Sequence, residues 1–173
     1  EVAQFVQIDL GPPVLDAQLI PTTLQGDSAH GNRVVNVPLD LQGTPLPVTC
    51  VSLGTPRCVV FSQLNDELVS QLGPFLEIAD CFPEQTSVDF AQVITGKEIS
   101  VRSWERGFGE QKASVEGACA ALVAAVLAKN TERQATIRLP DGDLEVEWDE
   151  TNNHVFVGGS AVEVFSGTWN GLS

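Results

Sequence analysis

The chain contains no methionine, has few basic residues and lacks any long apolar run. Nine Lys and Arg stand against 23 Asp and Glu, so the formal net charge is −14. A negative field of this size repels phosphate backbones and anionic lipid surfaces, and we therefore expect no nucleic-acid binding. The longest apolar segment, residues 118–128, is about half of what a membrane-spanning helix needs. The absence of methionine predicts a processed or truncated piece of a longer protein.

Four cysteines are present, but none has C-x-x-C spacing, and the chain contains no N-x-S/T glycosylation sequence. They lie in or beside apolar stretches, as Cys50, Cys58, Cys81 and Cys119. This placement predicts buried, reduced thiols in an intracellular compartment, either a plastid stroma or a bacterial cytoplasm.

The length of 173 residues predicts a single domain over residues 1–173.

The acidic stretch of the chain, residues 141–150, alternates carboxylates with apolar side chains in the manner of a strand with a solvated outer face. The spacing of these acids matches no calcium loop, so we expect neither a metal nor a cofactor.

The local patterns predict about eight or nine strands and two helices. Residues 62–72 have helical periodicity, with Ser62 as a candidate cap and Gly73-Pro74 as a stop. Residues 116–129 are apolar on every side, which predicts a helix surrounded by protein. An α+β half-barrel follows, in which a curved, mostly antiparallel sheet wraps around one buried apolar helix. These strands are drawn from ten strand-like segments, residues 5–10, 34–41, 46–53, 58–61, 87–94, 98–105, 135–139, 144–148, 154–157 and 161–165.

Residues 104–121 read W-E-R-G-F-G-E-Q-K-A-S-V-E-G-A-C-A-A, a strand, a glycine loop and a helix N-terminus. This segment resembles W/Y-E-R-G-A-G-E-T-x-A-C-G-T/S-G-A-C-A-A of the diaminopimelate epimerases. Residues 48–58, V-T-C-V-S-L-G-T-P-R-C, similarly resemble the family's V-T-C-V-S-M-G-N-P-H-C. Together these motifs indicate the C-terminal domain of that family, most similar to its plant plastid and cyanobacterial branch, without the N-terminal sister domain.

The resemblance implies a cofactor-independent epimerase fold with one catalytic Cys from each of two domains. Ser114 stands where this domain's catalytic Cys is expected, and a hydroxyl is a far weaker acid than a thiol. The two histidines, His30 and His154, are not placed by sequence to activate it, so a serine triad is not expected. The alternative interpretation is that Ser114 has a purely structural role as the N-cap of the helix.

Most other positions that the family uses to hold substrate are also changed. Val115 and Glu116 replace small residues whose amides bind a carboxylate, so they crowd or fill that anion pocket. The remaining positions of interest are Thr55, Arg57 and Ser87, which replace Asn, His and Asn, and Glu105 and Arg106, which are retained. The retained pair is either a remnant of substrate recognition or a partly buried ion pair.

These changes predict a non-catalytic domain that acts as a structural or binding subunit, with a protein partner rather than a small-molecule substrate. The alternative is the C-terminal half of an amino-acid epimerase whose other half lies outside this chain, with Ser114 as a single trapping mutation. A third hypothesis is a sensor that binds an amino acid or dipeptide through Arg106 without converting it.

Overall fold

The computed structural model describes residues 4–26, 30–41, 43–169 and 171. All ten described strands belong to one sheet in the order β1-β10-β9-β8-β6-β5-β4-β3-β2, with β7 paired to β6 beside this row. Two neighbouring pairs are parallel, β4 with β5 and β6 with β8, and the others are antiparallel. The elements are β1 (Gln4–Asp9), β2 (Val37–Leu41), β3 (Thr44–Ser52), β4 (Pro56–Phe61), α1 (Asp66–Glu77), β5 (Ser87–Thr95), β6 (Glu98–Glu105), β7 (Gly109–Gln111), α2 (Val115–Leu127), β8 (Gln134–Leu139), β9 (Gly142–Trp148) and β10 (Val155–Ala161).

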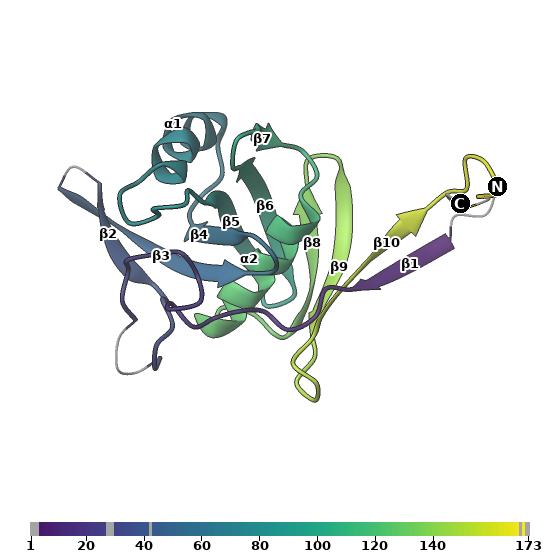
Figure 1. Cartoon of the computed structure of the whole chain (residues 1–173), viewed down its shortest axis with the longest axis horizontal. Helices are drawn as coiled ribbons and strands as arrows, with labels where there is room; N and C mark the ends of the chain where they lie inside the picture. The colour runs from purple at the N-terminus through teal and green to yellow at the C-terminus, as the bar shows by residue number, and fades with distance from the viewer. Residues whose placement is uncertain (1–3, 27–29, 42, 170, 172–173) are drawn as a thin grey trace.

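The sheet curves around α2, which confirms the predicted α+β half-barrel (Figure 1). Every side chain from Ala118 to Ala125 is fully buried, and the helix contacts strands from β3 to β10. Most of these side chains are small, so the strands approach the helix axis closely. The helix ends where Lys129 adopts a positive φ of 60°. None of the described helices is long and apolar enough to cross a membrane.

Helix α1 packs against β5, β6 and β7, outside the curve of the sheet. The predicted helix over residues 62–72 is wrong at both ends. Asn65, not Ser62, caps the helix by accepting a hydrogen bond from the Leu68 amide at 2.7 Å. The helix also continues through Gly73-Pro74 to Glu77. A Cβ on Gly73 would come within 2.6 Å of the Trp104 ring, so this glycine allows close packing rather than a stop.

Three strand predictions also differ from the structure. The predicted strand over 34–41 begins only at residue 37, because Asn36 adopts a positive φ of 52°. The strand predicted at 154–157 is part of β10, which continues to Ala161. The strand predicted at 161–165 is wrong beyond Ala161, because residues 162–165 pair with no described strand. With the short strand β7, which was not predicted, the described residues form ten strands rather than eight or nine.

Strands β1 and β10 extend away from the rest of the sheet as a two-stranded arm (Figure 1). Phe5 lies over Gly158, where a Cβ would come within 2.3 Å of the ring. Phe5 is nevertheless 63% exposed, and Ile8 is 52% exposed. The arm therefore carries apolar side chains that the described residues leave uncovered.

Strand β2 forms the opposite end of the sheet, where β3 is its one neighbour among the described strands. Pro38 of β2 lies opposite Pro47 of β3, and Asp40 lies opposite Pro45. Because proline has no backbone N–H, hydrogen bonds of this ladder involve the alternate residues of both strands.

Candidate active site

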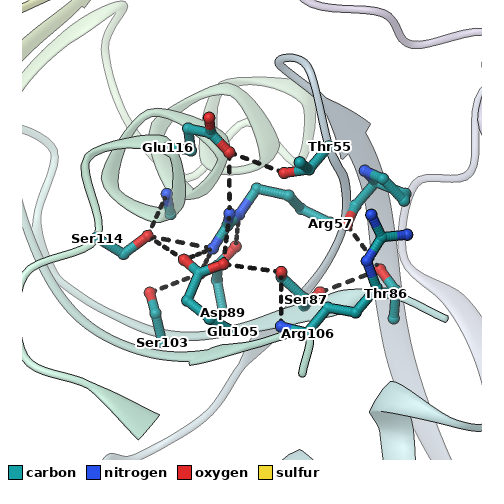
Figure 2. Close-up of polar contacts among 12 residues, drawn as sticks. Thr55, Arg57, Thr86, Ser87, Asp89, Ser103, Glu105, Arg106, Ser114 and Glu116 are labelled. Carbon is teal, nitrogen blue, oxygen red and sulfur yellow. Dashed lines mark hydrogen bonds and ion pairs between the residues drawn. The ribbon is translucent and has the colours of Figure 1, made fainter. Parts of the chain in front are cut away.

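The residues singled out from the sequence converge at the N-terminal end of α2, around the side chain of Arg57 (Figure 2). Arg57 lies on β4 and is only 1% exposed. Its guanidinium binds Asp89 of β5 in a bidentate manner, with Nε to Oδ2 at 2.7 Å and Nη2 to Oδ1 at 2.9 Å. A paired geometry of this kind suits the planar fork of arginine. Arg57 is thus the centre of a buried polar network.

Glu105, at the end of β6, is the second carboxylate of this network. Its Oε1 accepts from Arg57 Nη2 at 2.8 Å, and its Oε2 accepts from Ser87 Oγ at 2.9 Å. Burial acts to raise the pKa of Glu105, but the hydrogen bonds and charge of Arg57 outweigh it and hold that pKa below its usual range. Glu105 is therefore a carboxylate at neutral pH.

Arg57 itself is held in its charged form. Burial acts to lower the pKa of its guanidinium, but the charge and hydrogen bonds of Asp89, followed by those of Glu105, raise that pKa above its ordinary value. The guanidinium is a fixed cation that can neither take up nor release a proton.

Ser114 is the N-cap of α2, as the structural interpretation of this residue predicts. Its hydroxyl accepts from the Gly117 amide at 3.0 Å and donates to Glu105 Oε1 at 2.5 Å. Arg57 Nη2 lies 3.2 Å from the same oxygen. All the capacity of this hydroxyl is used by protein groups, so it is positioned as a structural link.

Glu116 occupies the first turn of α2 and faces the outer side of Arg57. Its Oε2 accepts from Thr55 Oγ1 at 2.8 Å and lies 3.5 Å from Arg57 Nη1. The obstruction of an anion pocket by this residue stays a prediction from the sequence. Its side chain is 42% exposed, whereas that of Arg57 is fully buried.

Of the retained pair, only Glu105 joins the network through its side chain. The Arg106 guanidinium donates to the Glu84 carbonyl at 2.9 Å, and its amide donates to Ser87 Oγ at 3.1 Å. The cation that pairs with Glu105 is Arg57, from a different strand. Arg106 thus fixes the loop after β6 rather than the carboxylate beside it in sequence.

Two members of this buried polar network were missed from the sequence, Asp89 and Ser103. Asp89 is fully buried on β5, and Ser103 Oγ donates to its Oδ1 at 2.6 Å. The signal was available, because an Asp within the apolar strand residues 87–94 must find a partner once buried. Its partner, Arg57, could not be identified without the parallel pairing of β4 and β5.

A cavity of about 420 Å³ opens beside this network. Val115 borders it and is 40% exposed. Among the described residues, no group of three or more His, Cys, Asp or Glu side chains is arranged to hold a metal ion. The other lining residues are Glu105, Phe108, Gln111, Ala113, Ser114 and Glu116.

The fold is shared with structures named as a racemase and an epimerase. A hydroxyproline epimerase from Agrobacterium vitis aligns with a TM-score of 0.57 at 10% identity, covering 90% of this chain and 49% of that one. A structure named as a probable proline racemase from Agrobacterium radiobacter aligns with a TM-score of 0.59 at 11% identity, covering 94% and 54%. At these identities the comparison defines the fold class, an α+β half of a racemase-type structure.

Sequence comparison then defines the family. The sequence model described as "Diaminopimelate epimerase" matches residues 49–164. A diaminopimelate epimerase of Synechococcus sp. (strain JA-3-3Ab) is 46% identical over 168 residues, which is 95% of this chain and 58% of the relative. That of Moorella thermoacetica is 40% identical over 163 residues, 94% of this chain and 57% of the relative. The chain belongs to the diaminopimelate epimerase family, and it spans less than two thirds of the length of these relatives.

Proposed function

We propose that this domain does not catalyse proton transfer and serves as a structural or binding subunit built on a diaminopimelate epimerase fold. The observation that carries the proposal is the state of Ser114. The residue at the family's reactive position caps a helix, and its hydroxyl is bonded to Glu105 and to the Gly117 amide.

The neighbouring groups do not replace the missing thiol. General acid–base catalysis is most efficient with a group whose pKa lies near the operating pH. The pKa of Glu105 is lowered by Arg57, and burial raises the pKa of the Cys119 thiol to about 12. Neither group alternates between protonated and unprotonated forms near neutral pH.

The charge of the site also opposes an anionic substrate. Arg57 contributes +1 against −3 from Asp89, Glu105 and Glu116, a balance of −2 for these four residues. The outermost of these charges is the Glu116 carboxylate, beside the cavity. A substrate carboxylate in that cavity would be repelled.

The test is exchange of the α-proton of diaminopimelate with deuterated water, measured by proton NMR on the protein together with any N-terminal domain. We expect no exchange above the uncatalysed rate. The variant Ser114→Cys is expected to stay inactive, because Val115 and Glu116 still occupy the anion pocket. The matched variant Ser114→Cys/Val115→Gly/Glu116→Thr restores the family motif. It tests whether residues 115 and 116, in addition to residue 114, prevent proton exchange. Exchange by the unaltered protein would refute the proposal.

The second candidate is an active epimerase in which this chain supplies one half. The observation in its favour is 40% to 46% identity to proteins named diaminopimelate epimerase. An upstream domain with the opposite catalytic Cys would support it, and proton exchange would then depend on that Cys. The exchange assay therefore decides between the two candidates.

Exposed apolar surface supports a protein partner for this subunit. Phe165 and Trp169, near the end of the chain, are each 83% exposed. Large apolar side chains that gather on a surface mark sites that other chains cover, and these two side chains are candidates for such a site. All four cysteines are free, and three of them are buried, which agrees with a reducing compartment such as a plastid stroma or bacterial cytoplasm.

A further inference from the structure

Two residues beside the cavity at the α2 N-terminus, Phe108 and Glu116, depart from the family motif. Phe108 stands where the motif has Ala, and Glu116 stands where it has Ser or Thr. Both line the same cavity of about 420 Å³. An aromatic ring and a carboxylate have thus entered one pocket, and the capping and charge balance described above do not require the ring.

The conformation of the backbone turn, rather than side-chain packing, holds Phe108 at the surface. It lies between Gly107 and Gly109, whose φ values are 78° and 82°, and its amide donates to the Glu105 carbonyl at 3.0 Å. Residues other than glycine rarely adopt such φ values, so the two glycines make this turn possible. The ring is 84% exposed. A large apolar side chain held in this way presents a face that a ligand can cover.

Glu116 presents a carboxylate to the same space. Its hydrogen bonds with Thr55 and Arg57 both involve Oε2, and Oε1 forms no hydrogen bond or ion pair with the described part of the chain. The guanidinium of Arg57 lies behind this carboxylate and pairs with Asp89 and Glu105. Lys112, the nearest basic residue along the loop, is not among the residues that line the cavity. The pocket therefore offers negative charge beside an aromatic face.

We infer that this cavity binds a lysine or arginine side chain presented by a segment of a partner protein. The cationic head pairs with the Glu116 carboxylate, and the stem or guanidinium plane lies on the Phe108 ring. A free amino acid is a poor ligand, because its own carboxylate meets Glu105 and Glu116. A residue within a polypeptide has no such carboxylate, and the net charge of −14 attracts basic segments. The inference rests on the proposed loss of catalysis, because a cation in this pocket takes the place of the substrate.

The experiment is an NMR titration of the amide resonances of this chain with N-acetyl-arginine-N-methylamide, with free arginine as the second arm. We expect saturable shifts confined to residues 107–117 and weaker binding of free arginine. Phe108→Ala removes a cation–π contact and is expected to weaken binding by roughly two- to fivefold. Glu116→Gln removes one exposed ion pair and is expected to have an effect of about the same size.

Glu150→Gln is the matched control, because it removes an exposed carboxylate that does not line the cavity. It is expected to leave the affinity unchanged. Absence of saturable shifts, or equal weakening by Glu150→Gln and Glu116→Gln, would overturn the inference as nonspecific attraction to an acidic surface. Preserved dispersion of the other resonances shows that each variant is folded. A negative titration leaves the proton-exchange result intact, so the two proposals can fail separately.

Discussion

The first turn of α2 and the rest of the same helix are stabilised in different ways. From Ala118 to Ala125 the side chains are fully buried among apolar groups. From Ser114 to Gly117 the helix instead meets hydroxyls, carboxylates and a guanidinium from three strands (Figure 2). One continuous helix therefore joins a non-directional apolar core to a directional polar network.

The difference shows what each part of the helix tolerates. Apolar packing depends on volume and excluded water, so substitutions of similar size have small effects. A buried ion network depends on specific partners, and loss of one partner leaves the others uncompensated. Substitutions in the polar network at the start of α2 therefore test the difference between the two parts of the helix most directly.

The largest effect is expected from Arg57→Met, which leaves the Asp89 carboxylate buried without its cation. We expect a loss of about 3–5 kcal/mol in the free energy of unfolding, measured by urea denaturation. The control is Arg138→Met, because Arg138 pairs with Glu98 at 2.6 Å but has a side chain that is 53% exposed. That change is expected to cost less than about 1 kcal/mol. Equal losses in the free energy of unfolding for the two variants would show that the buried network at the start of α2 is no more sensitive to a lost partner than an exposed ion pair. The contrast between the two parts of α2 would then not hold.

A smaller effect is expected from Gly117→Ala, at the junction of the two parts. The added Cβ would lie 2.3 Å from Ser103 Oγ and 2.4 Å from Asp89 Oδ1. Overpacking of this kind costs about 1–3 kcal/mol, visible as a lower urea midpoint. Gly96→Ala is the control, because its Cβ would meet nothing within 4 Å. A stable Gly117→Ala protein would show that the first turn can move away from β5 and β6.

The smallest effect is expected from Glu105→Gln, through its dependence on pH. Because the folded pKa of Glu105 lies below its ordinary value of 4.5, ionisation of this carboxyl stabilises the folded chain above that pH. The contribution is lost as the pH falls through the lowered folded pKa. The variant is expected to be about 1–2 kcal/mol less stable than the wild type at pH 7. The difference should shrink in urea titrations below pH 4.5, and a difference independent of pH would indicate another cause.

The fold could be predicted where burial leaves a simple pattern. The uninterrupted apolar run at residues 118–128 predicts a surrounded helix, and the structure confirms it. Local signals failed where packing between distant residues overrides them. Gly73 and Pro74 predict a helix end, but contact with Trp104 and burial of Leu76 accompany the continued helix.

The candidate site was only partly predictable for the same reason. The motif placed Ser114, Glu105 and Glu116 near one another, and the structure brings them together. It could not indicate that Arg57 pairs with Asp89, because this contact depends on two strands paired across the loop and helix between them. The departures from the family motif at Arg57 and Glu116 were also interpreted separately. The sequence therefore did not show that these two side chains face each other.

The prolines at the β2 end of the sheet have a consequence for association between chains. Pro38 lies in β2 at a position whose backbone faces away from β3, so the outer edge of β2 lacks an N–H donor there. A further strand added at this edge would leave one of its carbonyl groups unpaired. The edge is thereby protected against strand addition, and growth of the sheet into an aggregate is disfavoured at this end.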